Sequence, residues 1–260
     1  MISLSIADGI AEVVLNAPHK LNSLDEQALK DLTQAYDDAA AAASRGEVRA
    51  LLLRGEGRAF CAGRDIAGVT PETDDVQAYL GGLLQPLLQK MTAFPAPTFA
   101  AAQGACLGVG LGLLLATDVV YVAEDAKFGS PFAKLGATLD SGGHWYFTER
   151  LGMHRTLDLI YTAELMSGAE AVAQGMFSRA MPKDELLENT RGIVAKVASG
   201  ATGAFNASKD LVAHIRDQRL GLWEAMEEEN AEQARLCKSE DYSEGFKAFQ
   251  EKRTPEFKNR

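Results

Sequence analysis

Two stretches rich in small residues organise this chain: Ala59-Phe60-Cys61-Ala62-Gly63-Arg64-Asp65-Ile66 and Gln103-Gly104-Ala105-Cys106-Leu107-Gly108-Val109-Gly110-Leu111-Gly112. Each follows a short apolar run typical of a buried strand, Ala50–Leu53 for the first and Pro97–Ala102 for the second. Glycine permits sharp turns and lets backbone N–H groups come close to a bound group. The sequence therefore predicts two tight loops at strand ends, both with accessible backbone donors.

Two interpretations fit these loops. They serve only close packing, as glycine-rich turns of α/β proteins often do, or they direct two N–H groups at one oxygen and form an oxyanion hole. The run Leu111–Thr117 predicts a buried helix, whose N-terminal dipole would favour a developing negative charge. A nucleotide site is not indicated, because the stretch 108–113 misses the third glycine of G-x-G-x-x-G and no Gly-Lys-Ser/Thr follows.

Strand and helix patterns alternate along the rest of the chain. Met1–Leu15 predicts a β-hairpin, and the capping box Ser23-Leu24-Asp25-Glu26 predicts the start of a helix that runs to Ala43. The further expected elements are a polar irregular segment Pro71–Leu80, helix Leu83–Thr92, helix Leu111–Ala116, strand Asp118–Ala123, a helix capped by Ser167, a strand near Ser178–Met181, and helices from Glu185 onward that are broken only at Gly200–Gly203. The pattern is that of an α/β protein with a helical C-terminal end.

Composition narrows the class of protein. A chain of 260 residues fits one compact domain with a helical appendage, and a net charge of −10 disfavours nucleic acid and anionic membranes as partners. The apolar stretch Ala96–Thr117 is long enough to span a membrane, but its proline and glycines favour a strand, a turn and a buried helix. We expect a soluble, cytoplasmic protein without a secretory signal. The cysteines are expected to be reduced, buried and space-filling: Cys61, Cys106 and Cys237.

Taken together, the motifs resemble the crotonase superfamily, also known as the enoyl-CoA hydratase/isomerase family. Besides the two loops, the resemblance includes Asn16-Ala17-Pro18 to Asn22-Ser23-Leu24, Ala126-Lys127-Phe128-Gly129 and Glu251-Lys252-Arg253-Thr254-Pro255-Glu256-Phe257. It implies an α/β spiral of repeated ββα units over residues 1–203, with a helical region over residues 204–260 that packs on neighbouring subunits of a homotrimer or a dimer of trimers. It also implies an acyl-CoA thioester as substrate, with no cofactor besides the coenzyme A of that substrate and no metal.

The resemblance further implies site residues. The N–H groups of Arg64 and Val109 would form the oxyanion hole. The residues that would contact the substrate or its coenzyme A part are Lys20, Leu21, Ala62, Asp65, Ile66, Gly110, Phe132, Leu135, Phe249 and Lys252. Anionic coenzyme A needs local positive charge, which Lys20 or the C-terminal cluster could supply; the alternative for that cluster is a solvated, frayed tail. The cluster consists of Lys252, Arg253, Lys258 and Arg260.

The chain departs from the hydratase pattern of the family. Hydratases divide the proton transfers between two glutamates, and the matching positions here are Gly112 and Phe132, neither of which can move a proton. One acid remains, Asp140 in Gly136-Ala137-Thr138-Leu139-Asp140-Ser141-Gly142-Gly143. Local sequence alone favours a helix N-cap at Asp140, whereas the resemblance to members with a single catalytic aspartate favours a base. Its apolar neighbours Phe132, Leu135 and Leu139 are expected to raise its pKa.

Within the family, the segment 134–145 and the ending from Asp241 resemble bacterial phenylacetate-pathway isomerases that open ring epoxides of phenylacetyl-CoA. Those enzymes are similar to isomerases that shift a double bond from the β,γ to the α,β position. A single aspartate suffices for that shift, because it can carry a proton between the α- and γ-carbons of one dienolate. His144 departs from the small hydroxyl residue expected there, and is either a second proton carrier or a partly exposed histidine at a helix start.

Three alternatives remain. One is a chlorobenzoyl-CoA dehalogenase-like enzyme with Asp140 as nucleophile, although Phe132 replaces the expected tryptophan and the helix Leu83–Thr92 contains no histidine. Another is a weak enoyl-CoA hydratase. The third, from a different class, is a non-catalytic acyl-CoA-binding scaffold, which the loss of both glutamates would explain.

Overall fold

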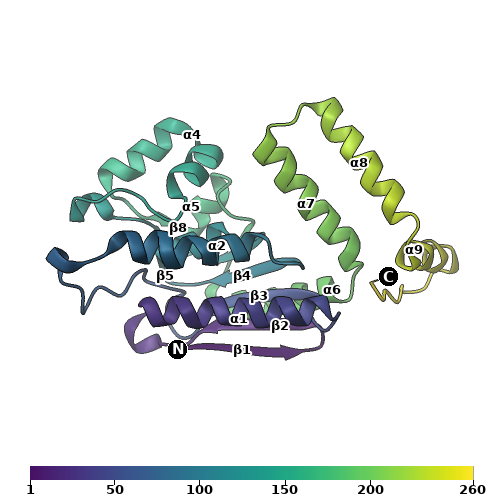
Figure 1. The fold of residues 1–260 in the computed structure, drawn as a ribbon, viewed down its shortest axis with the longest axis horizontal. Coiled ribbons are helices and arrows are strands. Elements are labelled where there is room, and N and C mark those ends of the chain that lie inside the picture. The colour runs from purple at the N-terminus through teal and green to yellow at the C-terminus, as the bar shows by residue number, and fades with distance from the viewer. Residues whose placement is uncertain (260) are drawn as a thin grey trace.

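The computed structural model describes residues 1–259. Its main feature is a six-stranded sheet in the order β1-β2-β3-β4-β6-β9 (Figure 1). The strands are β1 (Ile2–Ala7), β2 (Ile10–Leu15), β3 (Ala50–Gly55), β4 (Thr98–Ala102), β6 (Val119–Ala123) and β9 (Arg179–Met181). The first two strands form the antiparallel hairpin predicted for Met1–Leu15, and every other pairing in this sheet is parallel.

A second, three-stranded sheet was not predicted. It consists of β5 (Ala105–Leu107), β7 (Lys127–Gly129) and β8 (Met166–Ser167). The chain passes from β4 into β5 through Gly104, whose φ is +61° and whose missing β-carbon would lie 2.0 Å from the carbonyl oxygen of Arg58. Only glycine fits this turn. These strands have two or three residues each, which is too short for a periodic pattern in the sequence.

Helices cover both faces of the main sheet. α1 (Glu26–Ser44) and α2 (Gln85–Thr92) lie side by side across the front of the sheet in Figure 1, while α6 (Lys183–Ala198) packs against β2, β3, β4 and β6. The remaining helices of the core are α3 (Val109–Leu115), α4 (Gly143–Thr162) and α5 (Gly168–Ala173), with short turns η1 (Pro18–Lys20), η2 (Pro71–Thr73) and η4 (Phe132–Leu135) and the π-helical segment η3 (Ala78–Leu84). The α/β fold class is thereby confirmed.

Several predicted boundaries were wrong. The side chain that caps α1 is Asp25, which accepts a hydrogen bond from the N–H of Ala28, rather than Ser23. The end of the segment predicted to be irregular, Pro71–Leu80, instead enters the π-helical turn of η3, which leads without a break into α2. The prediction of a capping box at Ser167 is correct, since its hydroxyl accepts from the N–H of Glu170.

The C-terminal helices extend away from the core toward one end of the molecule (Figure 1). They are α7 (Thr202–Gln218), α8 (Leu222–Leu236) and α9 (Glu240–Glu251), so the predicted break at Gly200–Gly203 is not the only one. Lys209 anchors α7 to the core, because its ammonium pairs with Asp118 at 3.0 Å and donates to the carbonyl of Phe94 at 3.0 Å. In the part of the chain that the structure describes, no helix is long and apolar enough to cross a membrane.

Candidate active site

The two glycine-rich loops lie against each other. The N–H of Cys61 donates to the carbonyl of Ala105 at 3.0 Å, and the N–H of Leu107 donates to the carbonyl of Cys61 at 3.0 Å. A β-carbon on Gly110 would lie 2.5 Å from the carbonyl oxygen of Cys61, so the close approach requires glycine there. The structure therefore brings together the two loops that sequence analysis placed at strand ends.

Each loop carries an N–H group at the predicted position. Val109 is the first residue of α3, where an N–H has no partner within the helix. On the other loop, Gly63 accepts from the N–H of Leu24 and Asp65 donates to the carbonyl of Leu24, each at 2.9 Å. Neither of these two hydrogen bonds involves the N–H of Arg64. Within residues 1–259, neither the Arg64 N–H nor the Val109 N–H donates to a protein acceptor, as an oxyanion hole requires.

The side chain of Arg64 is held by groups that sequence analysis did not find. Its guanidinium forms two hydrogen bonds with the carboxylate of Asp74, at 2.6 and 2.8 Å, and stacks on the ring of Tyr79 at 4.2 Å. The buried Tyr79 in turn donates its hydroxyl to the carbonyl of Leu24 at 2.9 Å. Leu24 is the residue that pairs with both neighbours of Arg64, so this chain of contacts fixes the loop on either side of the Arg64 N–H.

Asp140 lines a cavity of about 510 Å³ between η3, α2 and the start of α4. Its carboxylate accepts a hydrogen bond from the hydroxyl of Ser141 at 2.7 Å. Burial raises its pKa above the ordinary aspartate value, although the Ser141 hydrogen bond and the nearby Arg64 guanidinium lower it in part. A carboxyl with a raised pKa is suited to exchanging protons near neutral pH.

The local alternative for Asp140, a helix N-cap, is wrong. The N-cap of α4 is Gly142, which has no capping side chain. The predicted rise in the pKa of Asp140 is confirmed, but its source differs in part, because Leu135 is 68% exposed. The apolar side chains that line the cavity with Asp140 are Leu80, Leu84, Leu88, Leu139 and Tyr146.

The two positions that the family resemblance matches to the hydratase glutamates, Gly112 and Phe132, lie close to Asp140 and the second loop. Gly112 faces Ser141, since a β-carbon on Gly112 would lie 2.3 Å from the Ser141 β-carbon. Phe132 faces the second loop, with its ring 3.0 Å from where a β-carbon of Gly108 would be. Among the described residues that line the cavity, Asp140 is the one carboxylate.

Several predicted coenzyme A contacts gather beside Arg64. The Lys20 ammonium pairs with Asp65 at 2.8 Å and with Asp25 at 3.2 Å, and the N–H of Ala62 donates to the carbonyl of Leu21 at 2.9 Å. Ile66 follows and is 58% exposed. Lys20 thus lies beside the first loop, but its charge is already compensated by two carboxylates.

The structure does not bring the C-terminal residues to this site. Phe249 belongs to α9 and Lys252 directly follows that helix, which lies at the opposite end of the molecule from α4 (Figure 1). Phe249 is 85% exposed, and Arg253 pairs with Glu244 and Glu251. Their predicted role therefore needs a second subunit. Arg260 of the predicted basic cluster lies outside the described residues.

His144 and the cysteines are not part of the cavity lining. The His144 ring nitrogen Nε2 lies 3.1 Å from the hydroxyl of Thr138, and the side chain is exposed, as the second interpretation expected. Cys61 and Cys106 are buried; burial raises the pKa of the Cys61 thiol to about 12 and that of Cys106 well above its ordinary value, which favours space-filling. Cys237 is exposed, so the expectation of burial was wrong there.

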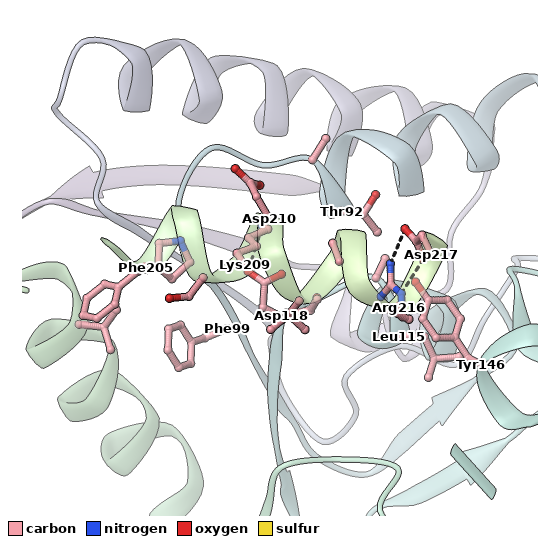
Figure 2. A pocket seen from close by; sticks show the side chains of 18 of the residues that line it. Thr92, Phe99, Leu115, Asp118, Tyr146, Phe205, Lys209, Asp210, Arg216 and Asp217 are labelled. Atoms are coloured by element: carbon pink, nitrogen blue, oxygen red, sulfur yellow. Dashed lines mark hydrogen bonds and ion pairs between the residues drawn. The ribbon is translucent and has the colours of Figure 1, made fainter. Parts of the chain in front are cut away.

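A larger cavity, of about 780 Å³, lies between α7 and the core (Figure 2). Thr92 and Tyr146 line both cavities, so the two are direct neighbours. Figure 2 shows Arg216, bonded to Asp217, beside Tyr146 at one end of the larger cavity. The cavity that contains Asp140 thus borders the helical C-terminal region.

Comparison with known proteins agrees with this geometry. The structure has the crotonase fold: it superimposes on the crystal structure of an enoyl-CoA hydratase from Bacillus anthracis with a TM-score of 0.90 at 29% identity, covering 100% of this chain and 99% of that one. The family model described as "Enoyl-CoA hydratase/isomerase" matches residues 5–260. The chain belongs to the enoyl-CoA hydratase/isomerase family.

Two curated relatives illustrate the activities that are described for members of this family. A protein from Rhodobacter capsulatus with the description "Probable enoyl-CoA hydratase" is 35% identical over 259 residues, covering 100% of this chain and 98% of the relative. The "1,2-epoxyphenylacetyl-CoA isomerase" of Escherichia coli is 28% identical over 257 residues, covering 97% of this chain and 96% of the relative. The family resemblance inferred from the motifs is confirmed, and the descriptions of the relatives include a probable hydratase and an isomerase.

Proposed function

We propose that the protein is an acyl-CoA isomerase in which Asp140 alone carries the proton. One observation carries the proposal: Asp140 is the one carboxylate among the described residues that line the cavity. The positions that the family resemblance matches to the hydratase glutamates hold Gly112 and Phe132. Water addition needs one group to activate water and one to protonate the α-carbon. An isomerisation needs one group that removes a proton and returns it elsewhere.

The proposed reaction uses the two N–H donors and the carboxylate together. The thioester oxygen of a β,γ-enoyl-CoA accepts hydrogen bonds from the N–H groups of Arg64 and Val109. Asp140 removes a proton from the α-carbon, and the electron pair moves into a dienolate whose charge rests on that oxygen. The protonated carboxyl of Asp140 then returns the proton to the γ-carbon, which forms the α,β-enoyl-CoA and restores the carboxylate.

The same groups suit a ring-epoxide thioester, where charge again develops on the carbonyl oxygen during opening. The cavity supports an apolar or aromatic acyl group, because four leucines and the ring of Tyr146 line it; Gln77, Gln85 and Gln89 add a few polar groups. The similarity to the Escherichia coli isomerase supports this chemistry, and the similarity to named hydratases supports a weak hydratase as the main competitor.

A dehalogenase is less well supported. The helix that would supply its histidine contains only Gln89 and Lys90 as polar residues near its middle. Gln89 lines the cavity, while Lys90 pairs with Asp37 of α1 at 2.5 Å. Neither Gln89 nor Lys90 replaces the histidine that a dehalogenase with Asp140 as nucleophile would need.

We also propose that the active form is a trimer or a dimer of trimers, with residues 204–260 packed on neighbouring subunits. The C-terminal helices support this assembly by exposing large apolar side chains, namely Val212, Leu222, Trp223, Phe246 and Phe249. In such an assembly a neighbour would supply Phe249 and Lys252 to the coenzyme A site.

The experiment that tests the proposed function measures two activities of the wild-type protein side by side. Isomerisation of a short β,γ-enoyl-CoA and hydration of crotonyl-CoA are followed at equal enzyme concentration. We expect isomerisation to be at least about 100-fold faster, because hydration lacks a second proton carrier whose contribution is about 10²–10⁴-fold. Hydration as fast as isomerisation would make the protein a hydratase. Binding of acyl-CoA without either reaction would make it a scaffold.

A further inference from the structure

The serine that follows Asp140 stands in an unusual backbone conformation. Ser141 has φ of +54°, in the left-handed region that residues other than glycine rarely adopt. In that conformation its hydroxyl lies 2.7 Å from Oδ1 of Asp140 and donates a hydrogen bond to it. Such local strain persists only where surrounding contacts impose it.

The contact that accompanies this conformation is with Gly112, in α3. A β-carbon on Gly112 would lie 2.3 Å from the Ser141 β-carbon and 2.8 Å from its hydroxyl oxygen. Both separations are far below a van der Waals contact, so any larger residue at position 112 would displace Ser141. Ser141 therefore occupies the space that a side chain at position 112, such as the glutamate expected in a hydratase, would need.

We propose that Ser141 is the positioning residue of the Asp140 base, and that Gly112 is the residue that admits it. The inference rests on the proposed role of Asp140. The Ser141 hydroxyl occupies one carboxylate oxygen, Oδ1, and fixes the plane of the carboxylate. The other oxygen, Oδ2, stays available for the proton of the substrate.

The titratable groups around Asp140 determine, together with the Ser141 hydroxyl, the pKa of the Asp140 carboxyl. The Arg64 guanidinium from the first loop favours the Asp140 carboxylate, burial and in smaller part the charge of Asp140 in turn raise the pKa of Tyr79 in η3, and Tyr146 from α4 lines the same cavity. A hydroxyl that donates to a carboxylate stabilises its charged form. Removal of the hydroxyl therefore raises the pKa of Asp140, and the raised pKa moves the acid limb of activity to higher pH.

The test compares pH profiles of kcat/KM for β,γ-enoyl-CoA isomerisation in Ser141→Ala and Gly112→Ala. The first variant removes the hydroxyl and keeps the β-carbon; the second keeps the hydroxyl and pushes it away. We expect the acid limb to move up by about one pH unit in both, with about a tenfold loss below the limb. Thr138→Ala is the matched control, because Thr138 lies in the same loop but contacts His144; its profile should coincide with that of the wild type.

Carboxyl ¹³C NMR titration of Asp140 without substrate gives a second readout that does not depend on turnover, and serves if Gly112→Ala does not fold. An unmoved pKa and acid limb in folded Ser141→Ala would overturn the role of Ser141, even if Asp140→Asn is inactive. If Asp140→Asn keeps full isomerase activity, the proposed function itself fails, while the titration still reports whether Ser141 perturbs Asp140.

Discussion

The carboxylate of Asp74 holds the guanidinium of Arg64 through two hydrogen bonds of 2.6 and 2.8 Å, ten residues along the chain. This pair, together with the stacking of Arg64 on Tyr79, fastens the loop whose Arg64 N–H is proposed to bind the thioester oxygen. Preorganised donors contribute most to catalysis when their direction is fixed before the reaction. The ion pair is thus proposed to hold a backbone donor in place.

We expect Asp74→Asn to lower kcat about tenfold, less than the 10²–10³-fold loss typical of removing a donor outright. The Arg64 N–H stays in the chain but is held less firmly, so KM should change little. Glu47→Gln is the control, because Glu47 forms a similar two-bonded pair with Arg45 in an exposed turn. If Asp74→Asn and Glu47→Gln have the same kinetics, the Arg64–Asp74 ion pair has no role in catalysis.

Val109→Pro should reduce isomerase turnover by about 10²–10³-fold, since proline has no N–H to donate. Val109 is the first residue of α3, a position where proline is well tolerated in helices, so the fold should survive. Val109→Ala keeps the N–H and should stay near the wild-type rate. Steady-state kinetics with circular dichroism measures both, and normal turnover in a folded proline variant would contradict the oxyanion hole.

Asn22 lies outside the first loop and is predicted to stabilise it. It is fully buried, and its side-chain amide donates to the carbonyls of Glu56, Ala59 and Phe60 at 2.9–3.1 Å. Asn22→Ala leaves these carbonyls without a donor and should lower the free energy of unfolding by about 3 kcal/mol. The exposed Asn16→Ala should leave it unchanged. Urea unfolding measures both, and equal stability of the two variants would contradict the role.

Assembly can be checked by light scattering. The apolar side chains Leu222 and Trp223 are 67% and 72% exposed in the single chain, which an isolated protein would not favour. We expect a mass of three or six times 27.9 kDa at micromolar concentration. Trp223→Glu should shift the population toward smaller species. A monomer mass for the wild type would contradict the assembly.

The sequence predicted the two loops because they rest on local chemistry, whereas the proposed role of Asp140 came from the family resemblance. Small residues after buried strands predicted the turns, and Asp140 was the acid left after Gly112 and Phe132 were excluded. The support of the site was not predictable in the same way. Asp74 and Tyr79 meet Arg64 only through the folding of η2 and η3, which the sequence pattern represented as irregular. The three strands of the second sheet were missed for a different reason, because two or three residues are too few for a periodic pattern.

Removal of the Asp140 charge should stabilise the fold. The folded protein raises the pKa of Asp140, so it favours the protonated form more than the unfolded chain does. Stability from this group is therefore lost as the pH rises from the ordinary aspartate range through the raised pKa. Thermal unfolding of Asp140→Asn should show a higher Tm than the wild type near neutral pH, and the difference should vanish below about pH 4. A lower Tm at neutral pH would contradict the burial argument.

Whether Asp140 alone transfers the proton is decided by the rate of β,γ-enoyl-CoA isomerisation in the Asp140→Asn variant. Asparagine keeps the size of the side chain and can still accept from Ser141, but it cannot take up the α-proton. We expect a loss of at least about 10²-fold in kcat for the folded variant, with acyl-CoA binding retained. Isomerisation at the wild-type rate would contradict it.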